Sequence, residues 1–493
     1  MKWRLPELLA ASGIQLRAPV PDLPIRQVTD DSRAVTKESL FVAIRGERVD
    51  GHRFLQQAVE RGAGVVFVEE DAPLPPAVVK FRVPATRPLL GPLVHAFWGA
   101  PSKSLKVVGV TGTNGKTTVA WLIHHLFEQA GLPSGLIGTI CYRVGDSQRP
   151  SENTTPGVVR LNQMLREMVA LKLKACSMEV SSHSLDQHRT DGIRFSCGVF
   201  TNLSPEHLDY HETLERYLQA KLRLFQGLDA GATAVVNRDD PASGPVREAV
   251  QGRVVTFGLK EGADFSATEI RASLEETACK VRTPEGLFPV RWRMIGRHNV
   301  ENLLAAVAAA ASCGVPVRQA MAAVESFPGV PGRLERVEMG QPFPVLIDYA
   351  HTDGALRSVL EQCRAASPRR ILAVFGCGGD RDRTKRPRMG RVAAELADRV
   401  IITSDNPRSE DPERIAEEVA AGIQGMTTPC GIILDRREAI RAALEAADQD
   451  WLVLIAGKGH EAGQILKDRT IPFDDRVVVR ELLSHGPVSQ LSG

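Results

Sequence analysis

Residues 109–118, GVTGTNGKTT, have the types and spacing of a loop that binds the phosphates of a nucleotide. Gly112 and Gly115 leave room for backbone N–H groups to face a phosphate, and the helix that starts after them favours negative charge at its N-terminus. In such loops the lysine, here Lys116, reaches the β- and γ-phosphates, and the adjacent hydroxyl, here Thr117, binds Mg²⁺. We therefore predict an ATP or GTP site in this segment.

This loop departs from the generic pattern G-x-x-x-x-G-K-[ST] at its first position. Val110 stands where that pattern has glycine, and the glycine comes one residue earlier, at Gly109. A Gly-Lys-Thr sequence can also begin a helix without binding a nucleotide, but the order of strand, loop and helix favours the phosphate site. The nucleotide-binding residues predicted in the loop are Gly112, Thr113, Asn114, Gly115, Lys116, Thr117 and Thr118.

Two other charged residues follow strand-like segments. Glu179 comes near the end of the run KACSMEV, a place where nucleotide-binding domains put an acidic Mg²⁺ ligand; the alternative is a solvated carboxylate. Arg408, in DNPR, follows RVIITS, so we expect it in a loop at the carboxyl end of a parallel sheet, where ligands bind in α/β folds. A guanidinium group there matches a carboxylate in bidentate geometry, and the alternative is an exposed loop arginine.

The elements that position these residues alternate between strands and helices. VVGV (107–110) precedes a segment with apolar residues at i, i+3 and i+4 spacing, which predicts a helix. This alternation predicts parallel sheets in doubly wound α/β domains. Pro- and Gly-containing stretches at 82–105 and 327–338 indicate domain boundaries near residues 99 and 333. Further strands are expected in FSCGVFTNL (195–203), ATAVVN (232–237), PVLIDYAH (344–351), RRILAVFG (369–376), DRVIITSD (398–405) and DWLVLIAG (450–457).

Composition excludes several classes of protein. The chain has 493 residues, 43% of them hydrophobic and 24% charged, which is typical of globular proteins. Lys and Arg (61) nearly balance Asp and Glu (59), so no nucleic-acid partner is expected. The sequence has no signal-peptide pattern and no apolar run long enough to cross a membrane, and its eight cysteines have no zinc spacing. We therefore expect a soluble, cytoplasmic, multidomain protein whose cysteines are reduced and lie in the core.

Ten segments in a fixed order resemble the Mur ligase family, whose variant phosphate loop TGTNGKTT also matches. Each short motif is weak by itself, but the ordered set along nearly the whole chain is highly specific. The Pro and acidic residue that the family has after DYAHT are replaced here by Asp353 and Gly354, so the turn that follows can differ. The segments are DSRAVTKESLFVAIRGERVDGHRF (31–54), ENTTP (152–156), MEVSSHSLDQHR (178–189), TNLSPEHLDYHETLERYLQAKLRLF (201–225), GRHNVENLLAA (296–306), PGRLE (331–335), DYAHT (348–352), FGCGGDRDRTKRP (375–387), DNPRSEDP (405–412) and AGKGHE (456–461).

This resemblance implies a three-domain α/β architecture. Residues 1–98 would bind the UDP moiety of a substrate, and residues 99–332 would form a central ATP-binding domain with a parallel sheet. Residues 333–493 would form a Rossmann-like domain that binds an amino acid. Within the family, the motifs are most similar to members that add meso-diaminopimelate to the D-Glu γ-carboxylate of UDP-MurNAc-L-Ala-D-Glu in peptidoglycan synthesis. The reaction implied is an ATP-dependent amide ligation through an acyl phosphate, by a protein expected to be monomeric.

The resemblance also assigns roles around ATP. Lys116, Glu179, His207 and Lys221 would be catalytic. Thr117, Glu179, His207 and Lys221 would hold Mg²⁺, with Lys221 carrying a CO₂-derived carbamate. Taken alone, His207 would be a structural loop histidine and Lys221 a snorkelling helical lysine. The remaining ATP contacts would be Asn299, Arg333 and Asp348, whose alternatives are a helix N-cap for Asn299 and a salt bridge between Arg333 and Asp348. Because the loop and these residues fall in different domains, domain closure is expected to complete the site.

Two further sets of residues would bind the other substrates. The contacts to UDP-MurNAc-dipeptide would be Ser32, Asn153, Thr154, Thr155, Ser181, Gln187 and Arg189; Ser32 can instead be a cap. The contacts to diaminopimelate would be Arg381, Asp405, Asn406, Pro407, Arg408, Gly457 and Glu461.

Three other functions stay open at this stage. A lysine-adding member would share the chemistry but replace the arginine of DNPR. A folylpolyglutamate synthase would share the phosphate loop but would not need the segments 31–54 and 405–412. A P-loop binding protein without ligase activity would not need Glu179, His207 and Lys221 together.

Overall fold

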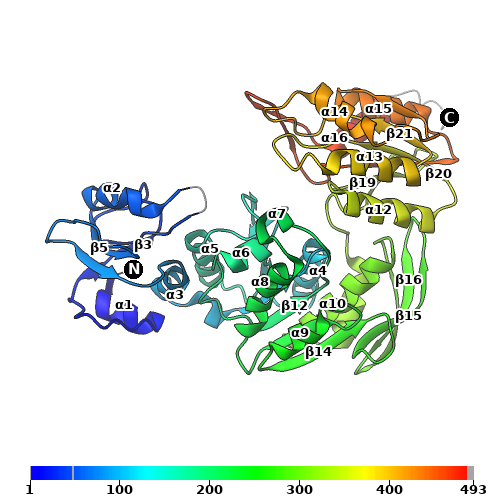
Figure 1. Ribbon diagram of the computed structural model, residues 1–493. Coiled ribbons are helices and arrows are strands. Elements are labelled where there is room, and N and C mark those ends of the chain that lie inside the picture. Colours follow the sequence, from blue (N-terminus) through cyan, green and yellow to red (C-terminus); the bar gives the residue numbers. More distant parts are fainter. Residues whose placement is uncertain (1, 47–48, 486–493) are drawn as a thin grey trace. The chain divides into compact units, whose positions relative to one another are not determined.

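The computed structural model describes residues 2–46 and 49–485 of the chain (Figure 1). By their contacts, the residues form two compact units. The first unit contains the chain up to residue 266 together with 282–287 and 301–323, and the second contains 267–281, 288–300 and the chain from 324 onward. Each unit is described separately below.

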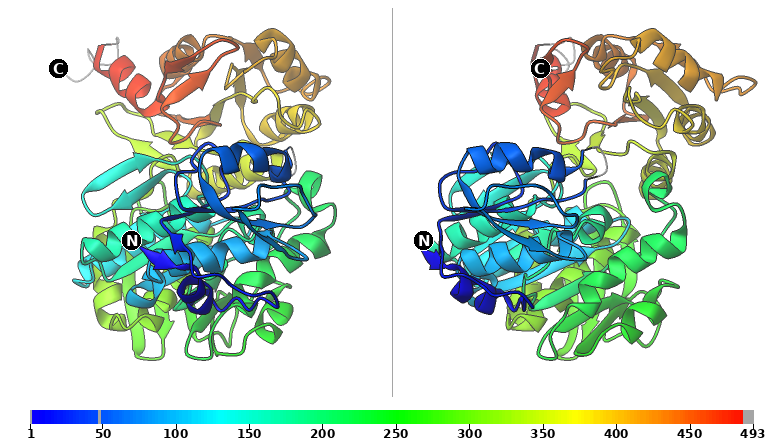
Figure 2. Two further views of the ribbon diagram at one scale, coloured as in Figure 1. Left: turned by 90° about the vertical axis from the view of Figure 1, so that its left-hand side faces the viewer. Right: turned by 60° about the vertical axis from the view of Figure 1, so that its left-hand side comes forward.

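The first unit begins with a small parallel sheet of strand order β3-β4-β5-β6. Figure 2 shows this sheet in dark blue, with α2 over one face and α1 over the other. Leu5, Leu8 and Leu9 of α1 pack with Leu93 and Val94 of α3 in one core, and Leu55 and Ala58 of α2 belong to a second core. The elements are β1 (Trp3–Arg4), α1 (Leu5–Ser12), β2 (Pro24–Ile25), β3 (Gln27–Thr29), β4 (Ser39–Val42), η1 (Gly51–Phe54), α2 (Leu55–Glu60), β5 (Ala63–Val68), β6 (Val79–Arg82) and α3 (Arg87–Phe97).

The large sheet has the order β10-β9-β8-β11-β7-β12-β13-β14-β15-β16-β17. The stretch from β8 to β15 is parallel, and β9 and β10 add antiparallel strands at one edge. The central strands are buried along their length, which explains their continuous apolar runs. Its strands are β7 (Lys106–Thr111), β8 (Ser134–Ile137), β9 (Cys141–Val144), β10 (Ser147–Pro150), β11 (Ala175–Glu179), β12 (Cys197–Phe200), β13 (Thr233–Asn237), β14 (Arg253–Gly258), β15 (Phe265–Ala272), β16 (Thr277–Thr283) and β17 (Gly286–Trp292).

The helices of this region follow the strands that the sequence predicts. Helix α4 starts at Lys116, directly after the phosphate loop, and α8 carries Lys221 near its middle. Helix α3 packs against α5, and η2 packs against α5 and β7. The elements are η2 (Pro101–Ser104), α4 (Lys116–Gln129), α5 (Val158–Ala170), α6 (Ser182–Asp186), α7 (Leu208–His211), α8 (Leu214–Gln226), α9 (Ser243–Glu248), α10 (Arg297–Ser312), α11 (Val317–Ala323) and η3 (Val324–Ser326).

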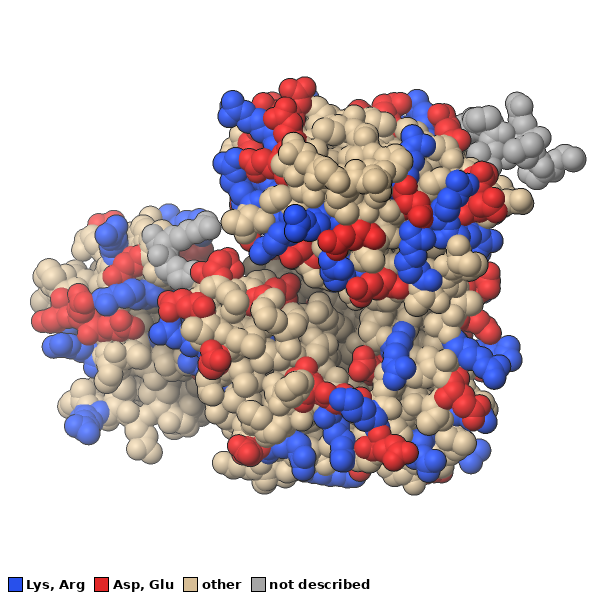
Figure 3. Space-filling view, turned by 45° about the vertical axis from the view of Figure 1, so that its right-hand side comes forward, with Lys and Arg blue, Asp and Glu red and all other residues tan. Residues whose placement is uncertain are grey.

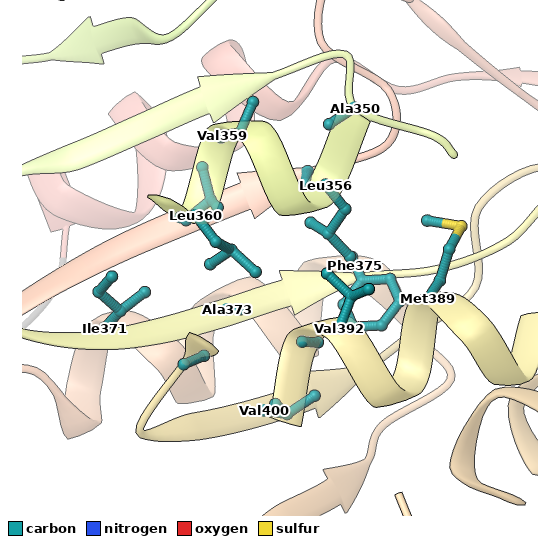
Figure 4. Packing of buried hydrophobic residues seen from close by; sticks show 14 of the residues in the cluster. Ala350, Leu356, Val359, Leu360, Ile371, Ala373, Phe375, Met389, Val392 and Val400 are labelled. Carbon is teal, nitrogen blue, oxygen red and sulfur yellow. The ribbon is translucent and has the colours of Figure 1, made fainter. Parts of the chain in front are cut away.

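The second unit is built on a six-stranded sheet of order β18-β19-β23-β20-β21-β22, in which only β18 is antiparallel to its neighbour. Figure 4 shows one core, where Leu356 and Leu360 of α12 and Val392 of α13 pack against Phe375 of β20. The opposite face is covered by α15 and α16. The elements are β18 (Glu335–Val337), β19 (Val345–Asp348), α12 (Asp353–Ala366), β20 (Arg370–Phe375), α13 (Lys385–Leu396), β21 (Arg399–Ile402), α14 (Pro412–Ala421), β22 (Cys430–Ile432), α15 (Arg436–Ala446), β23 (Trp451–Ala456), β24 (Gly463–Ile465), β25 (Thr470–Pro472) and α16 (Asp475–His485).

These sheets confirm the predicted α/β class and every strand named from the sequence. One expectation is wrong: seven cysteines are buried, but Cys430 is exposed because it lies on β22, the edge strand of its sheet. Within residues 2–46 and 49–485, no helix is long and apolar enough to span a membrane. On the face in Figure 3, basic and acidic side chains are interspersed. The boundaries near 99 and 333 stay predictions.

The unusual Asp353-Gly354 pair forms the first turn of α12. Thr352 is the N-cap, and its side chain accepts a hydrogen bond from the backbone N–H of Ala355 at 3.3 Å. Asp353 places a carboxylate in the first turn, where it interacts favourably with the helix dipole. A Cβ on Gly354 would have no heavy atom within 4 Å. The pair therefore changes the residues of the turn without preventing the helix from starting there.

We predict that Gly354→Ala stabilises α12 by about 0.5 kcal/mol, because alanine loses less backbone entropy than glycine in a helix. Hydrogen exchange of the α12 amides, followed by mass spectrometry, measures the effect as slower exchange. Gly425→Ala is the matched control: it also has open space, but its φ of +81° is in the left-handed region, so alanine should destabilise the second unit. Faster exchange in Gly354→Ala would contradict the prediction.

Candidate functional site

The phosphate loop connects β7 to α4 and is braced by the end of β12. Gly112 has φ +146°, and a Cβ there would overlap the Thr201 hydroxyl, so only glycine fits. The Thr201 hydroxyl donates to the Asn114 carbonyl at 2.6 Å, and the Asn114 N–H donates to Asn202 Oδ1 at 2.9 Å. Gly115 also has positive φ, +85°. The loop is thus held in shape by side chains from the segment directly after β12, 87 residues further along the chain in the case of Thr201.

Lys116 and Lys221 converge on the same backbone oxygen of this loop. Lys116 Nζ donates to the carbonyls of Gly112 (3.0 Å) and Thr113 (2.7 Å), and Lys221 Nζ donates to the Gly112 carbonyl at 2.8 Å. Lys221 is 1% exposed, and its ammonium group lies 4.1 Å from the centre of the Tyr217 ring. Burial, together with the charge of Lys116, lowers the pKa of Lys221 well below its usual value. Lys221 is therefore no snorkelling lysine.

Glu179, at the end of β11, is buried beside the start of α4. Its Oε2 accepts hydrogen bonds from Thr117 Oγ1 at 2.9 Å and Thr139 Oγ1 at 3.1 Å, and its Oε1 accepts from the Thr139 N–H at 2.8 Å. The residue is 1% exposed. A Cβ on Gly138 would overlap Oε1, so glycine lets the chain pass this carboxylate. The alternative of a solvated strand-end carboxylate is excluded.

His207 lies in the loop before α7, with φ +57° and a half-exposed side chain. Its ring lies 4.9 Å from that of His183 and 6.2 Å from that of Tyr217, measured between centroids. Burial lowers the pKa of His207, although Glu206 raises it. Thr113 Oγ1 and the Tyr217 hydroxyl are 3.3 Å apart, so Tyr217 links this cluster to the phosphate loop. The structure thus brings His207 and Lys221 close to the same tyrosine ring.

The oxygen atoms of Thr117 and Glu179 are the ligands that Mg²⁺ prefers. Among the described residues, no three His, Cys, Asp or Glu side chains lie close enough to hold a metal by themselves. This sparse protein shell fits Mg²⁺, which is usually held by one or two carboxylates plus waters and substrate phosphates. The hydrogen-bonded pair of Thr117 and Glu179 is therefore compatible with the predicted Mg²⁺ site.

Four of the predicted UDP-MurNAc-dipeptide contacts form one hydrogen-bonded group. Thr155 Oγ1 accepts from the Ser181 N–H at 3.1 Å, and the Thr155 carbonyl accepts from Arg189 at 2.9 Å. Arg189 also donates to Gln187 Oε1 at 2.6 and 3.1 Å. Gln187 Nε2 is 3.4 Å from the hydroxyl of Tyr210, which sequence reasoning did not single out. The backbone carbonyl of Glu179 accepts from Thr155, so this group adjoins the Glu179 site.

The other three predicted contacts lie in two places: Asn153 and Thr154 lie near this group, and Ser32 lies in the small N-terminal sheet domain. Thr154 Oγ1 lies 3.0 Å from Thr139 Oγ1, and the backbone of Asn153 bonds to the Tyr142 hydroxyl, so both lie near the same group. Ser32 lies in the small N-terminal sheet domain, where its hydroxyl donates to Gln57 Oε1 at 2.7 Å. Ser32 is 7% exposed and does not cap a helix.

The remaining predicted ATP contacts belong to the second unit. Asp348 ends β19, and its two oxygens accept from the N–H groups of Leu334 and Ala350, both at 2.8 Å. Burial raises the pKa of Asp348, and the Arg333 charge lowers it. The Arg333 guanidinium lies 5.1 Å from the centre of the Tyr349 ring. Asn299 is not an N-cap: α10 begins at Arg297, and Asn299 Nδ2 donates to the Ile295 carbonyl at 2.8 Å.

The DNPR segment forms a loop after β21, at the carboxyl end of the parallel sheet, as predicted. Asp405 and Asn406 are 8% and 3% exposed, and Pro407 is also buried. Arg408 has φ +52° and donates to the Gly379 carbonyl at 2.8 Å, so it is an anchored residue rather than a freely exposed one. Asp405 Oδ2 is buried without a hydrogen-bond partner in the described part of the chain, and a Cβ on Gly457 would lie 2.8 Å from it.

Two buried cations of this region were missed by sequence reasoning. Arg386 is fully buried on α13 and donates to both carboxylate oxygens of Glu410, at 2.8 and 3.0 Å. Glu410 Oε1 also accepts from the Asp380 N–H at 2.6 Å, which ties the Arg381-containing loop to the DNPR loop. Lys458 is fully buried between Asn406 and Glu461. Both residues lie within motifs quoted from the sequence, FGCGGDRDRTKRP and AGKGHE, which was the available signal, but the sequence does not show that they are buried.

The chain is similar to three domain models of one family. The Mur ligase family catalytic domain matches residues 24–97, the Mur ligase middle domain matches 110–310, and the Mur ligase glutamate ligase domain matches 332–459. These matches cover most of the chain.

Curated proteins and a solved structure agree with these models. UDP-N-acetylmuramoyl-L-alanyl-D-glutamate–2,6-diaminopimelate ligase of Listeria innocua is 41% identical over 483 residues, covering 97% of this chain and 98% of that protein. The protein of the same name from Geobacillus thermodenitrificans is 43% identical over 456 residues, covering 91% and 93%. A solved structure of a ligase with this name is 33% identical, with a TM-score of 0.74 and full coverage of both chains.

The Arg386–Glu410 pair predicts a specific acid sensitivity. The hydrogen bonds from Arg386 lower the pKa of Glu410 to about 2, whereas an unfolded glutamate has a pKa of about 4.3. The stabilisation is therefore fully present above about pH 5 and is lost as the pH falls towards 2. We expect Glu410→Gln to have a lower melting temperature than wild type at pH 7. The difference between the two melting temperatures should become smaller as the pH falls towards 2. Glu417→Gln, at an exposed position on α14, is the control and should follow the wild-type profile; parallel profiles for Glu410→Gln and wild type would contradict the assignment.

Proposed function

The chain belongs to the Mur ligase family, and from this premise we propose that it is an ATP-dependent ligase that joins meso-diaminopimelate to UDP-MurNAc-L-Ala-D-Glu. The observation that carries this proposal is the near-full-length similarity, at about two identical residues in five, to proteins named as 2,6-diaminopimelate ligases. The loop around Arg408 supports the choice of amino acid, because it offers a guanidinium group for a second carboxylate. The product belongs to peptidoglycan synthesis.

A carboxylate must be activated before an amine can attack it. The D-Glu γ-carboxylate oxygen displaces ADP from the γ-phosphorus of ATP, which gives an acyl phosphate. The amine of diaminopimelate then attacks the acyl carbon, and phosphate leaves as the amide bond forms. The phosphate loop and Lys116 position the triphosphate and counter its negative charge, which is most of what phosphoryl transfer needs from a protein. Asn299, Arg333 and Asp348 are proposed as further ATP contacts.

We assign Thr117, Glu179, His207 and the N-carboxylated side chain of Lys221 to Mg²⁺. Thr117 and Glu179 are already hydrogen-bonded to each other at 2.9 Å, Lys221 contacts the Gly112 carbonyl of the loop, and the His207 ring lies 6.2 Å from the Tyr217 ring, which Lys221 also contacts. Bound there, Mg²⁺ would neutralise phosphate charge. The side chain of His207 is half-exposed, so it can bind a metal ion without first breaking a buried hydrogen bond.

Lys221 is proposed to carry a carbamate. A neutral amine is the form that reacts with CO₂, and the low pKa of Lys221 favours this form. The carbamate replaces a cation beside Lys116 with an anion, so the repulsion between two ammonium groups becomes an attraction. The buried setting protects the modification from water.

The two remaining substrates are assigned to separate residue sets. The linked group of Thr155, Ser181, Gln187 and Arg189 offers hydroxyl, amide and guanidinium groups to the oxygen-rich muramoyl peptide. Asn153 and Thr154 are assigned to the same substrate, and Ser32 to the uridine end. Arg381, Asp405, Asn406, Pro407, Arg408, Gly457 and Glu461 are assigned to diaminopimelate. The monomeric state and the cytoplasmic location stay predictions.

We predict that Lys221→Ala abolishes ligation, because it removes the amine that carries the carbamate, and that elevated CO₂ does not restore activity. Carbon-13 NMR after incubation with labelled bicarbonate should show a carbamate signal in the wild type and none in the variant. Gln219→Ala, at an exposed position on the same helix, is the control and should keep both activity and signal. An active Lys221→Ala protein, or a signal that survives the substitution, would contradict this role.

The function is tested by an amino-acid panel with ATP and UDP-MurNAc-L-Ala-D-Glu, with phosphate release and product mass as readouts. Wild type should use meso-diaminopimelate and use L-lysine poorly at equal concentration. Arg408→Ala should weaken the use of diaminopimelate by roughly 2–5 kcal/mol, because one carboxylate is left desolvated and unpaired. If wild type prefers L-lysine, the proposed amino acid is wrong. In a parallel assay with a folate in place of UDP-MurNAc-L-Ala-D-Glu, glutamylation of the folate would favour the folylpolyglutamate alternative. ATP binding without any ligation would favour a non-catalytic P-loop protein.

A further inference from the structure

Lys458 is a fully buried lysine in the turn after β23, between two glycines with positive φ. Gly457 has φ +111°, and a Cβ there would lie 2.8 Å from Asp405 Oδ2. Gly459 has φ +52°, and a Cβ there would lie 2.7 Å from Tyr349 Cβ. The two glycines therefore allow the turn to pass close to its neighbours and to direct the lysine into the protein. A lysine in such a place needs partners for its charge.

The ammonium group of Lys458 has two anchors in the proposed diaminopimelate site. It donates to Asn406 Oδ1 at 3.1 Å and to Glu461 Oε2 at 3.0 Å. Asn406 Oδ1 also accepts from the Ile465 N–H at 2.9 Å, and Asn406 Nδ2 donates to Glu461 Oε2 at 2.8 Å. Because the backbone N–H can only donate, these contacts fix the orientation of the carboxamide. Asn406 is left with one N–H to offer, so it can recognise only an acceptor, such as a carboxylate oxygen.

The same ammonium group contributes to the charge of the proposed site, which also includes the guanidinium groups of Arg381 and Arg408. Asp405 and Glu461 contribute two carboxylates, and Lys458 is the buried cation in direct contact with Glu461. Diaminopimelate carries one carboxylate more than L-lysine. Loss of the Lys458 charge would leave the site one unit more negative, which opposes the binding of that additional carboxylate more than it opposes the binding of L-lysine.

We propose that Lys458 is a positioning residue that determines specificity: it holds Asn406 as a hydrogen-bond donor and balances Glu461, so that the site accepts an amino acid with a second carboxylate. This inference rests on the proposed function, because it concerns the same diaminopimelate site. Lys458 is not a catalytic residue, since its contacts are to Asn406 and Glu461. Its loss should therefore affect the recognition of the amino acid rather than the use of ATP.

The test measures kcat and KM for meso-diaminopimelate and for L-lysine in Lys458→Met, which keeps an unbranched, slightly shorter side chain and removes the charge. We expect the KM for diaminopimelate to rise about tenfold or more, which corresponds to about 1.4 kcal/mol. The ratio of kcat/KM for diaminopimelate over L-lysine should fall, while the KM values for ATP and UDP-MurNAc-L-Ala-D-Glu stay within about twofold. Lys467→Met removes an exposed lysine of the β24–β25 turn and should change none of these values.

A second pair of variants keeps the test decisive if Lys458→Met does not fold. The double variant Glu461→Gln with Lys458→Met removes both charges of this ion pair, so neither charge is left buried without its partner. Compared with Glu461→Gln alone, the double variant should again have a lower preference for diaminopimelate over L-lysine. An unchanged ratio in both comparisons, or equal losses with both amino acids, would overturn the inference. If wild type does not use diaminopimelate, the proposed function itself fails, and this outcome is separate from the response to Lys458→Met.

Discussion

Two lysine ammonium groups share the carbonyl oxygen of Gly112, and the chemistry of the first unit depends on this arrangement. Each ammonium group adds positive charge beside the other, and because Lys221 is buried, its charged form is costly there. In the proposed function, triphosphate oxygens counter the charge of Lys116, and the lowered pKa of Lys221 favours its neutral form. The positive φ of Gly112 and the Thr201 hydroxyl behind it hold the oxygen in this position.

Glu179 connects the segment after the phosphate loop to other parts of the first unit. Its carboxylate connects the first turn of α4 to Thr139, and its backbone carbonyl connects to Thr155 of the proposed peptide site. The proposed nucleotide site and the proposed peptide site are thus adjacent because they share one strand end. This proximity suits a reaction in which the phosphoryl group passes from ATP to a carboxylate of the second substrate.

In the second unit, ion pairs with buried cations hold the loops of the proposed amino-acid site in position. Arg386 and Glu410 join the two loops that carry Arg381 and Arg408, and Lys458 joins Asn406 to Glu461. In these two pairs the cation is fully buried and the carboxylate is partly exposed, whereas in a third pair, Arg436 and Asp475, both side chains are fully buried. Breaking such a pair leaves a buried charge, so each loop is held in a narrow range of positions. Recognition of a small zwitterion benefits from this rigidity, because its charges must meet partners at fixed distances.

Local periodicity and ordered motifs were sufficient to predict the α/β class, the family and the strands that carry the proposed site. Glu179 lies at a strand end and Arg408 lies in the loop after β21, as the sequence predicts. The sequence did not show that Lys221 points inward to Gly112, 109 residues away, or that Lys458 and Arg386 are buried. A lysine or arginine has an apolar stem and a charged end, so its sequence position is equally compatible with a solvated surface and a buried contact. The partners that settle this choice come from distant parts of the chain, and no local pattern specifies them.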